Sequence, residues 1–172
     1  MYPWFRLIKV IVQARLAPRQ DPLSEIRTPM RVWPGDVDSF RHLNNGRYLT
    51  LCDLGRFDMV MRTGLMSLIR EKGWAPVVAT AAIRFRRSLD LFHQFELTTR
   101  ILFWDEKWFF IEHRFEREGD VYARALIKGV FRGREGTVSM GKILSALDET
   151  GRPIPEPTPS IDAWREFEST FK

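Results

Sequence analysis

Hydrophobic and polar positions follow two different periods along this chain. From about residue 45 to 72 the apolar side chains recur at steps of three and four, which predicts one long helix. Gly64 interrupts that pattern and Gly73 ends it. Beyond the helix, apolar and polar residues alternate, and this alternation predicts strands over 77–88, 93–104, 108–117, 121–133 and 137–147. A short strand is predicted over 28–34, before the helix.

The order of these elements predicts the fold class. One strand, one long helix and then a run of antiparallel strands is typical of an α+β fold in which the sheet buries one face on the helix. A chain of 172 residues suits one such domain. We expect an N-terminal amphipathic segment over 1–27, the domain over 28–156, and a C-terminal tail with a short helix over 157–172.

The N-terminal segment has two interpretations. Arg6, Lys9 and Gln13 fall on one helical face of residues 2–16, and apolar side chains cover the rest. The charges make the segment unsuitable for crossing a bilayer or for acting as a signal peptide. It is either a helix packed on the domain or on a second subunit, or an interfacial helix that makes peripheral contact with an anionic membrane.

Charge and cysteine content narrow the classes of function. The net charge is +5, and arginines scattered through the strands supply the excess. A basic surface attracts phosphate groups, but no nucleic-acid-binding motif is present, so we expect no nucleic-acid partner. No Cys/His cluster has metal-ligand spacing, so we expect no metal. One cysteine, Cys52, permits a reducing compartment, and we expect a cytoplasmic protein that is membrane-associated only under the second interpretation of residues 2–16.

The densest polar cluster comes directly before the long helix. The stretch GDVDSFRHLNN, residues 35–45, holds two aspartates, a histidine and two asparagines. Asn44 is placed to cap the helix, whereas Asp38 lies too far ahead of it to do so. The first N–H groups of a helix have no partner within it and can stabilise a developing oxyanion. A carboxylate beside them can deprotonate water or attack a carbonyl, so the cluster offers both parts that thioester hydrolysis needs.

Three stretches carry a resemblance to a known family. They are GDVD (35–38), HLNNGRYL (42–49) and DETGRPIP (148–155). With the order of elements over roughly 28–156, they resemble the 4-hydroxybenzoyl-CoA thioesterase-like family of acyl-CoA thioesterases. The resemblance implies the hotdog fold, in which an antiparallel sheet wraps around one long central helix. It also implies hydrolysis of an acyl-CoA to a free acid and CoA, without a cofactor, with an acyl-ACP as the less favoured substrate.

The resemblance also implies roles for individual residues. Asp38 corresponds to the catalytic carboxylate, acting as nucleophile or as base for water, and the N–H of Asn45 would hold the carbonyl oxygen. His42 either tunes Asp38 and orients water or forms a hydrogen bond across a turn. Phe40 stands where related plant acyl-ACP thioesterases carry asparagine, which favours a simpler site built on the carboxylate and the helix terminus. Hotdog proteins pair their sheets edge to edge, so we expect a homodimer or homotetramer.

Further residues are candidates for substrate binding or for structure. Asn44, Arg84, Arg86 and Arg87 are candidates for binding the substrate, the arginines through the phosphates of CoA. Arg132 and Arg134 at the end of another strand are further candidates, although a solvated strand face explains each arginine equally well. Structural roles are expected for Asp36 in a turn, the Asp53–Arg56 ion pair, Cys52 and His113 in the core, and His93 at the surface.

Two alternatives to the thioesterase stay open. One is a non-catalytic acyl-CoA-binding or acyl-binding hotdog protein, because a fold does not establish an activity. The other is a hotdog hydratase or dehydratase. The D-x-N-x-x-H pattern typical of that class is missing, which disfavours it.

Overall fold

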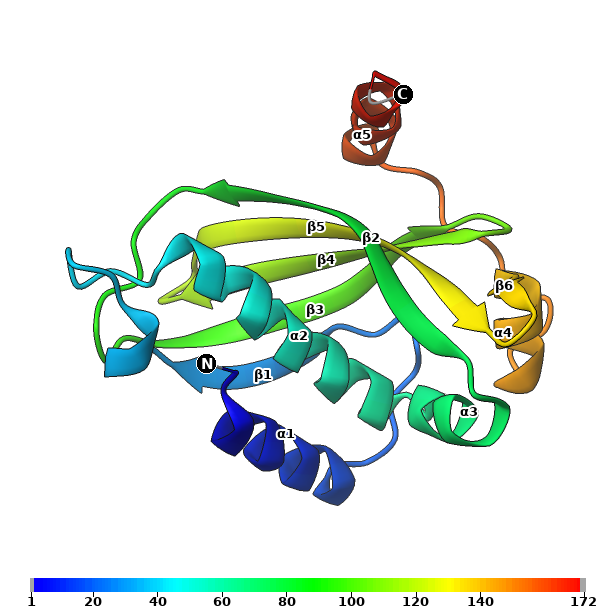
Figure 1. The fold of residues 1–172 in the computed structure, drawn as a ribbon, viewed down its shortest axis with the longest axis horizontal. Helices are drawn as coiled ribbons and strands as arrows, with labels where there is room; N and C mark the ends of the chain where they lie inside the picture. The colour runs from blue at the N-terminus through cyan, green and yellow to red at the C-terminus, as the bar shows by residue number, and fades with distance from the viewer. Residues whose placement is uncertain (1, 171–172) are drawn as a thin grey trace.

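In the computed structural model, which describes residues 2–170, a curved antiparallel sheet holds one long helix against its inner face (Figure 1). The sheet order is β1-β3-β4-β5-β2, with β6 paired to the end of β5. The predicted α+β arrangement of a sheet around one long helix is therefore confirmed. The strands are β1 (Ile26–Arg31), β2 (Ala75–Phe85), β3 (Gln94–Trp104), β4 (Trp108–Arg117), β5 (Asp120–Gly133) and β6 (Gly136–Val138).

The helical pattern over 45–72 forms two helices. α2 (Asn45–Arg62) is the central helix, and α3 (Leu65–Lys72) follows it. Between them Gly64 has a φ of 82°, in the left-handed region that glycine adopts without strain, so the chain turns there. The inner faces of α2, β3, β4 and β5 meet in a core that includes Tyr48, Leu51, Cys52, Leu97, Phe115 and Ala125.

The predicted strand over 137–147 is wrong beyond Val138. The chain leaves β6 and forms α4 (Met140–Ala146) instead. Ser139 caps this helix, with its hydroxyl accepting a hydrogen bond from the N–H of Lys142 at 3.4 Å. The buried residues Met140, Ile143 and Leu147 recur at steps of three and four, so their burial requires a helix.

Two more helices cover opposite faces of the sheet. α1 (Trp4–Leu16) lies beside α2 on the inner side, packed through Leu7, Val10 and Ala14 (Figure 1). α5 (Pro159–Ser169) packs on the outer face, where Ile161 joins Phe110 in a small apolar cluster. Within residues 2–170, every helix is too short or too polar to span a membrane.

Candidate active site

The loop between β1 and α2 folds back on itself. The N–H of Asp38 donates to the carbonyl of His42 at 2.9 Å, and the N–H of Asn44 donates to the carbonyl of Asp36 at 2.8 Å. Residues 36–38 therefore run antiparallel to residues 42–44, which lead directly into α2. This pairing places Asp36 opposite Asn44 at the start of the helix, and Asp38 opposite His42, further from the helix.

The carboxylate of Asp38 uses one oxygen to shape this loop. Oδ1 accepts the N–H of Phe40 at 2.9 Å and the N–H of His42 at 3.3 Å. Oδ2 has no partner among residues 2–170. The side chain is thus fixed through one oxygen, and the other is available to water or to a substrate. Phe40, at the tip of the loop, is exposed.

The start of α2 presents a free backbone donor. Asn44 is the N-cap, as predicted, and its side-chain oxygen accepts the N–H of Gly46 at 2.9 Å. The N–H of Asn45, the first helical residue, has no acceptor within the described chain. Because the N-terminus of a helix carries a partial positive charge, this donor is suited to bind an anionic oxygen.

Asp36 is buried and anchors the loop to the helices on either side of it in the chain. Its carboxylate forms ion pairs with Arg6 of α1 and Arg47 of α2, and it accepts the N–H of Trp33 at 2.8 Å. These contacts are those of a structural residue, and they join α1, the loop and α2 at one point. Arg6, expected on a polar stripe of α1, is therefore drawn into the site region.

His42 lies at the surface beside a residue that the sequence did not single out. Its Nε2 is 3.6 Å from Oδ1 of Asp90, and the two residues form an isolated β-bridge. The N–H of Asp90 donates to Nδ1 of His93 at 3.0 Å. No motif or spacing joins Asp90 to the loop, since the contact arises only when the segment before β3 folds against it.

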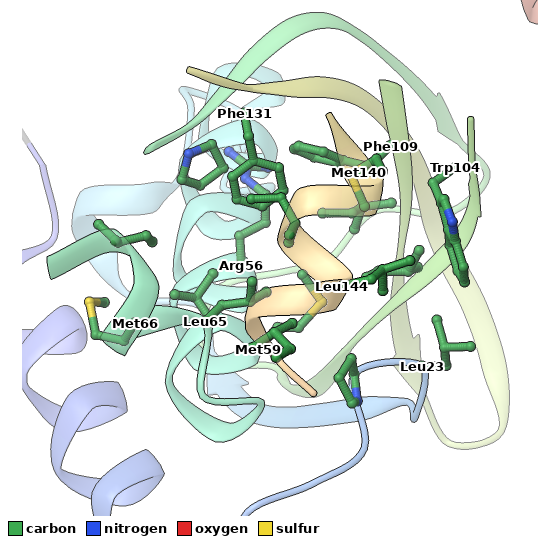
Figure 2. Close-up of a pocket in the computed structure, with 18 of the residues that line it drawn as sticks. Leu23, Arg56, Met59, Leu65, Met66, Trp104, Phe109, Phe131, Met140 and Leu144 are labelled. Carbon is green, nitrogen blue, oxygen red and sulfur yellow. The ribbon is translucent and has the colours of Figure 1, made fainter. Parts of the chain in front are cut away.

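A largely apolar cavity of about 420 Å³ lies further along α2. Figure 2 shows side chains from α3, α4 and the sheet pointing into it, among them Met66, Leu144, Phe109 and Phe131. The exposed side chains of Phe57, Val77 and Val78 also line the cavity, so it opens between α2 and β2. Its volume and lining suit an apolar ligand group.

The polar groups beside the cavity are paired. Asp53 and Arg56 form the predicted i, i+3 ion pair, and burial raises the pKa of Asp53. Nη1 of Arg56 is 3.5 Å from Nε2 of His113, which is fully buried and lies 2.9 Å from the Thr99 hydroxyl through Nδ1. Burial, together with the charge of Arg56, holds the pKa of His113 well below its usual range.

Cys52 is a buried core thiol, as predicted. Burial raises its pKa to about 12, so the thiolate that a nucleophile would need is not formed near neutral pH.

The arginines that the sequence suggests for phosphate binding lie in different parts of the structure. Phe85 of β2 points inward, its ring 4.9 Å from that of Tyr48, so the alternating Arg84 and Arg86 lie on the outer face of the sheet. The structure therefore places these two on the opposite face from α2. Arg87 forms an ion pair with Asp120. Arg132 and Arg134 are exposed at the end of β5 and in the turn after it.

Comparisons with known proteins identify the family of the chain. Residues 32–164 match the model of the thioesterase-like superfamily. The chain is 37% identical to Protein THEM6 of Danio rerio over 154 residues, covering 88% of this chain and 74% of that protein. It is 40% identical to Protein THEM6 of Xenopus laevis over 119 residues, covering 69% of this chain and 58% of that protein. The chain thus spans little more than half the length of the Xenopus relative.

Solved structures share the fold. The probable thioesterase YbaW of Escherichia coli superposes with a TM-score of 0.66 at 24% identity, covering 72% of this chain and 96% of that one. The BH1999 gentisyl-coenzyme A thioesterase superposes with a TM-score of 0.63 at 21% identity, covering 70% of this chain and 99% of that one. Both likenesses show the fold, and the predicted hotdog fold is confirmed. With a family model that matches most of its length, this chain belongs to the thioesterase-like superfamily.

Proposed function

We propose that this protein hydrolyses acyl-CoA thioesters to a free acid and CoA. The observation that carries the proposal is the unpaired N–H of Asn45 at the start of α2, next to a loop that holds the carboxylate of Asp38 with one oxygen free. A fixed donor at a helix terminus and a fixed carboxylate in the loop before it are the two groups that we propose for acyl transfer.

In the proposed reaction the thioester carbonyl oxygen accepts the N–H of Asn45. Asp38 then either removes a proton from water as water attacks the carbonyl carbon, or attacks that carbon itself through Oδ2. The carbon–sulfur bond breaks and CoA leaves as the thiol, taking the proton that Asp38 removed from water in the first route or a proton from solvent in the second. In the second route water hydrolyses the acyl-aspartyl anhydride and restores the carboxylate. We propose that His42, on the other strand of the loop, orders water near Asp38, and that Asn44 shapes the start of the helix.

The cavity beside α2 is the proposed site for the acyl group. Its lining is almost wholly aliphatic and aromatic, so it favours an apolar acyl chain over a polar one. The Asp53–Arg56 pair lies beside it and supplies a polar boundary.

We also propose that the protein is a homodimer joined through β2. This strand has 11 residues and, within residues 2–170, pairs only with β5, which leaves its other edge open. Val77, Val78 and Phe85 of β2 are exposed, as are Leu49 and Phe57 on the adjoining side of α2. A second copy would cover these side chains and the mouth of the cavity together. Light scattering tests this, and Val78→Lys should shift the dimer toward monomer, whereas a monomeric wild-type protein would contradict the proposal.

Arg84 and Arg86 remain the proposed contacts to the phosphates of CoA, although they lie on the face of the sheet opposite α2, so the proposal requires CoA to extend past the edge at β2 to reach them. Neither has an ion-pair partner within residues 2–170, whereas Arg87 is paired with Asp120. The double change Arg84→Gln and Arg86→Gln should raise KM for an acyl-CoA but leave KM for the matching acyl-pantetheine unchanged. A KM that rises equally for both substrates would remove these arginines from phosphate binding.

The test of hydrolysis is release of free thiol from a panel of acyl-CoAs of different chain length. Asp38→Asn should lower kcat about 10²-fold or more, the usual scale for losing a general base. Asp53→Asn, a matched change at a carboxylate that lines the cavity, should affect KM more than kcat. Unchanged turnover in Asp38→Asn would exclude that residue from the mechanism. Binding of acyl-CoA without thiol release would instead identify a non-catalytic binding protein.

A further inference from the structure

The helix α1 has two apolar faces, and within residues 2–170 only one of them is buried. Leu7, Val10 and Ala14 are buried against the domain. On the opposite side the apolar residues are exposed, Phe5 at 91% and Leu16 at 83%. This outward face consists of Trp4, Phe5, Ile8, Val12 and Leu16.

One cation borders the outward face and a second lies within it, and the helix carries no carboxylate. With 100° per residue, Lys9 lies just beyond Leu16, at one border of the apolar arc, whereas Arg15 lies within the arc, between Trp4 and Ile8 and in the last turn of the helix. Neither forms an ion pair within the part of the chain that the structure describes. Apolar side chains accompanied by such cations are typical of a helix that lies in the plane of an anionic bilayer, because the long side chains of Lys and Arg can bend to reach the headgroups.

The surface continues beyond the helix into the loop before the site. Trp33 is partly exposed and lines a shallow hollow together with Trp4 and Phe5. The guanidinium of Arg31 lies over the Trp33 ring, 5.8 Å from its centroid. Tryptophan with a neighbouring cation is typical of the layer between lipid tails and water.

A second copy of the chain fits this face less well. The edge strand proposed for the dimer is β2, whereas α1 lies over β1 at the other edge of the sheet (Figure 1). Two outward faces packed on each other would leave Lys9 and Arg15 without acidic partners, since α1 has none to offer. Anionic phospholipid headgroups supply the charge that the face lacks.

We propose that the outward face of α1 docks the protein on anionic phospholipid membranes. The face penetrates the headgroup layer, and Lys9 and Arg15 bind lipid phosphates. Since Arg6 joins the same helix to Asp36 in the site loop, the docked helix holds that loop beside the bilayer.

Vesicle co-sedimentation of the full chain tests this without any substrate, so its result is independent of the proposed hydrolysis. The wild-type protein should sediment with vesicles of phosphatidylcholine mixed with phosphatidylglycerol, less with phosphatidylcholine alone, and less again at high salt. Phe5→Asp with Ile8→Asp should abolish sedimentation. Lys9→Gln and Arg15→Gln should each weaken it about fivefold.

A matched control comes from the C-terminal segment. Ile154 is exposed to the same extent as Ile8, 57%, but lies far from α1 in the chain, so Ile154→Asp should sediment like the wild type. Circular dichroism melting should show that all variants stay folded, because the changed side chains face solvent. Negligible sedimentation of the wild type with every vesicle would overturn the proposal. A second result would also overturn it. If the Phe5→Asp, Ile8→Asp variant had a lower molecular mass by light scattering than the wild type, α1 would be joining copies of the chain.

Discussion

Arg6 of α1 forms an ion pair with Asp36, which is 3% exposed and lies two residues before the proposed catalytic carboxylate. The same guanidinium donates to the carbonyl of Arg31 at 3.0 Å, at the end of β1. One side chain thus connects the N-terminal helix with both ends of the segment that leads into the site. A helix that the sequence presents as a separate segment is, in the structure, a support for the loop.

Replacing Arg6 by methionine should destabilise the protein by about 1–3 kcal/mol. The change keeps an apolar stem but leaves the buried Asp36 carboxylate with fewer partners, and an under-satisfied buried acceptor costs about that much. Lys9→Met on the same helix is the control, since Lys9 is exposed and unpaired, and its effect should stay within about 0.5 kcal/mol. Urea denaturation measures both. Equal effects from the two changes would show that the Arg6–Asp36 pair adds nothing.

A second buried carboxylate stabilises the other end of α2. Asp58 is fully buried, and its carboxylate accepts hydrogen bonds from the Thr28 hydroxyl at 2.6 Å and from Nε of Arg62 at 2.6 Å. Asp58→Ala should cost about 3–5 kcal/mol, because it leaves a largely buried guanidinium without its partner. Asp53→Ala breaks a similar helical pair with Arg56, but its carboxylate is far more exposed, so we expect at most about 1 kcal/mol. Thermal or chemical denaturation that ranks the two variants the other way would contradict this account.

The features that the sequence predicts well are set by neighbouring residues. The long helix, the alternating strands and the Asn44 cap follow from spacing within one or two turns, and Gly64 marks the break between α2 and α3 through its own backbone preference. The error over 137–147 is also local in origin. Val138, Met140 and other alternating apolar residues imitate a strand, while Ser139 as a helix cap and the Met140–Ile143 spacing were signals for α4.

The remaining parts of the site depend on contacts between distant segments. Neither the Arg6–Asp36 pair nor the His42–Asp90 contact has any signature in spacing, because each forms only when the sheet curves around α2. For the same reason, the polar stripe on residues 2–16 includes Arg6 but does not indicate its partner. Helical periodicity shows which side chains share a face, but it does not show which of them will pair with a buried carboxylate from a distant segment.

Close packing between α2 and the sheet predicts a sensitive glycine. A Cβ atom on Gly55 would lie 2.5 Å from the Thr99 hydroxyl and 2.9 Å from Cδ2 of Leu97. Gly55→Ala should therefore cost about 1–3 kcal/mol through overpacking, despite the better helix propensity of alanine. Gly141 of α4 has nothing within 4 Å of such an atom, and Gly141→Ala should stabilise by up to about 1 kcal/mol. A Gly55→Ala variant as stable as the wild type would mean that α2 can move away from β3.

The buried His113 should make stability fall as the solution is acidified. Burial and the nearby Arg56 charge hold its pKa well below the value of about 6.5 that it has in the unfolded chain. Above that pH both states are neutral and the stability is fully present. Below it the unfolded chain takes up a proton that the folded protein does not, so the free energy of unfolding drops by at most about 1.4 kcal/mol per pH unit.

The test is urea denaturation of wild type and His113→Asn between about pH 7.5 and 5, a window that spans the ordinary histidine pKa. Asparagine can still bond to the Thr99 hydroxyl but does not titrate, so the variant should lose less stability over this range even if it starts lower. The other two histidines, His42 and His93, are present in both proteins, and their contributions cancel in the comparison. Equal pH dependence in the two proteins would mean that His113 is protonated in the folded state as readily as in the unfolded one, and that the interior beside Arg56 admits water.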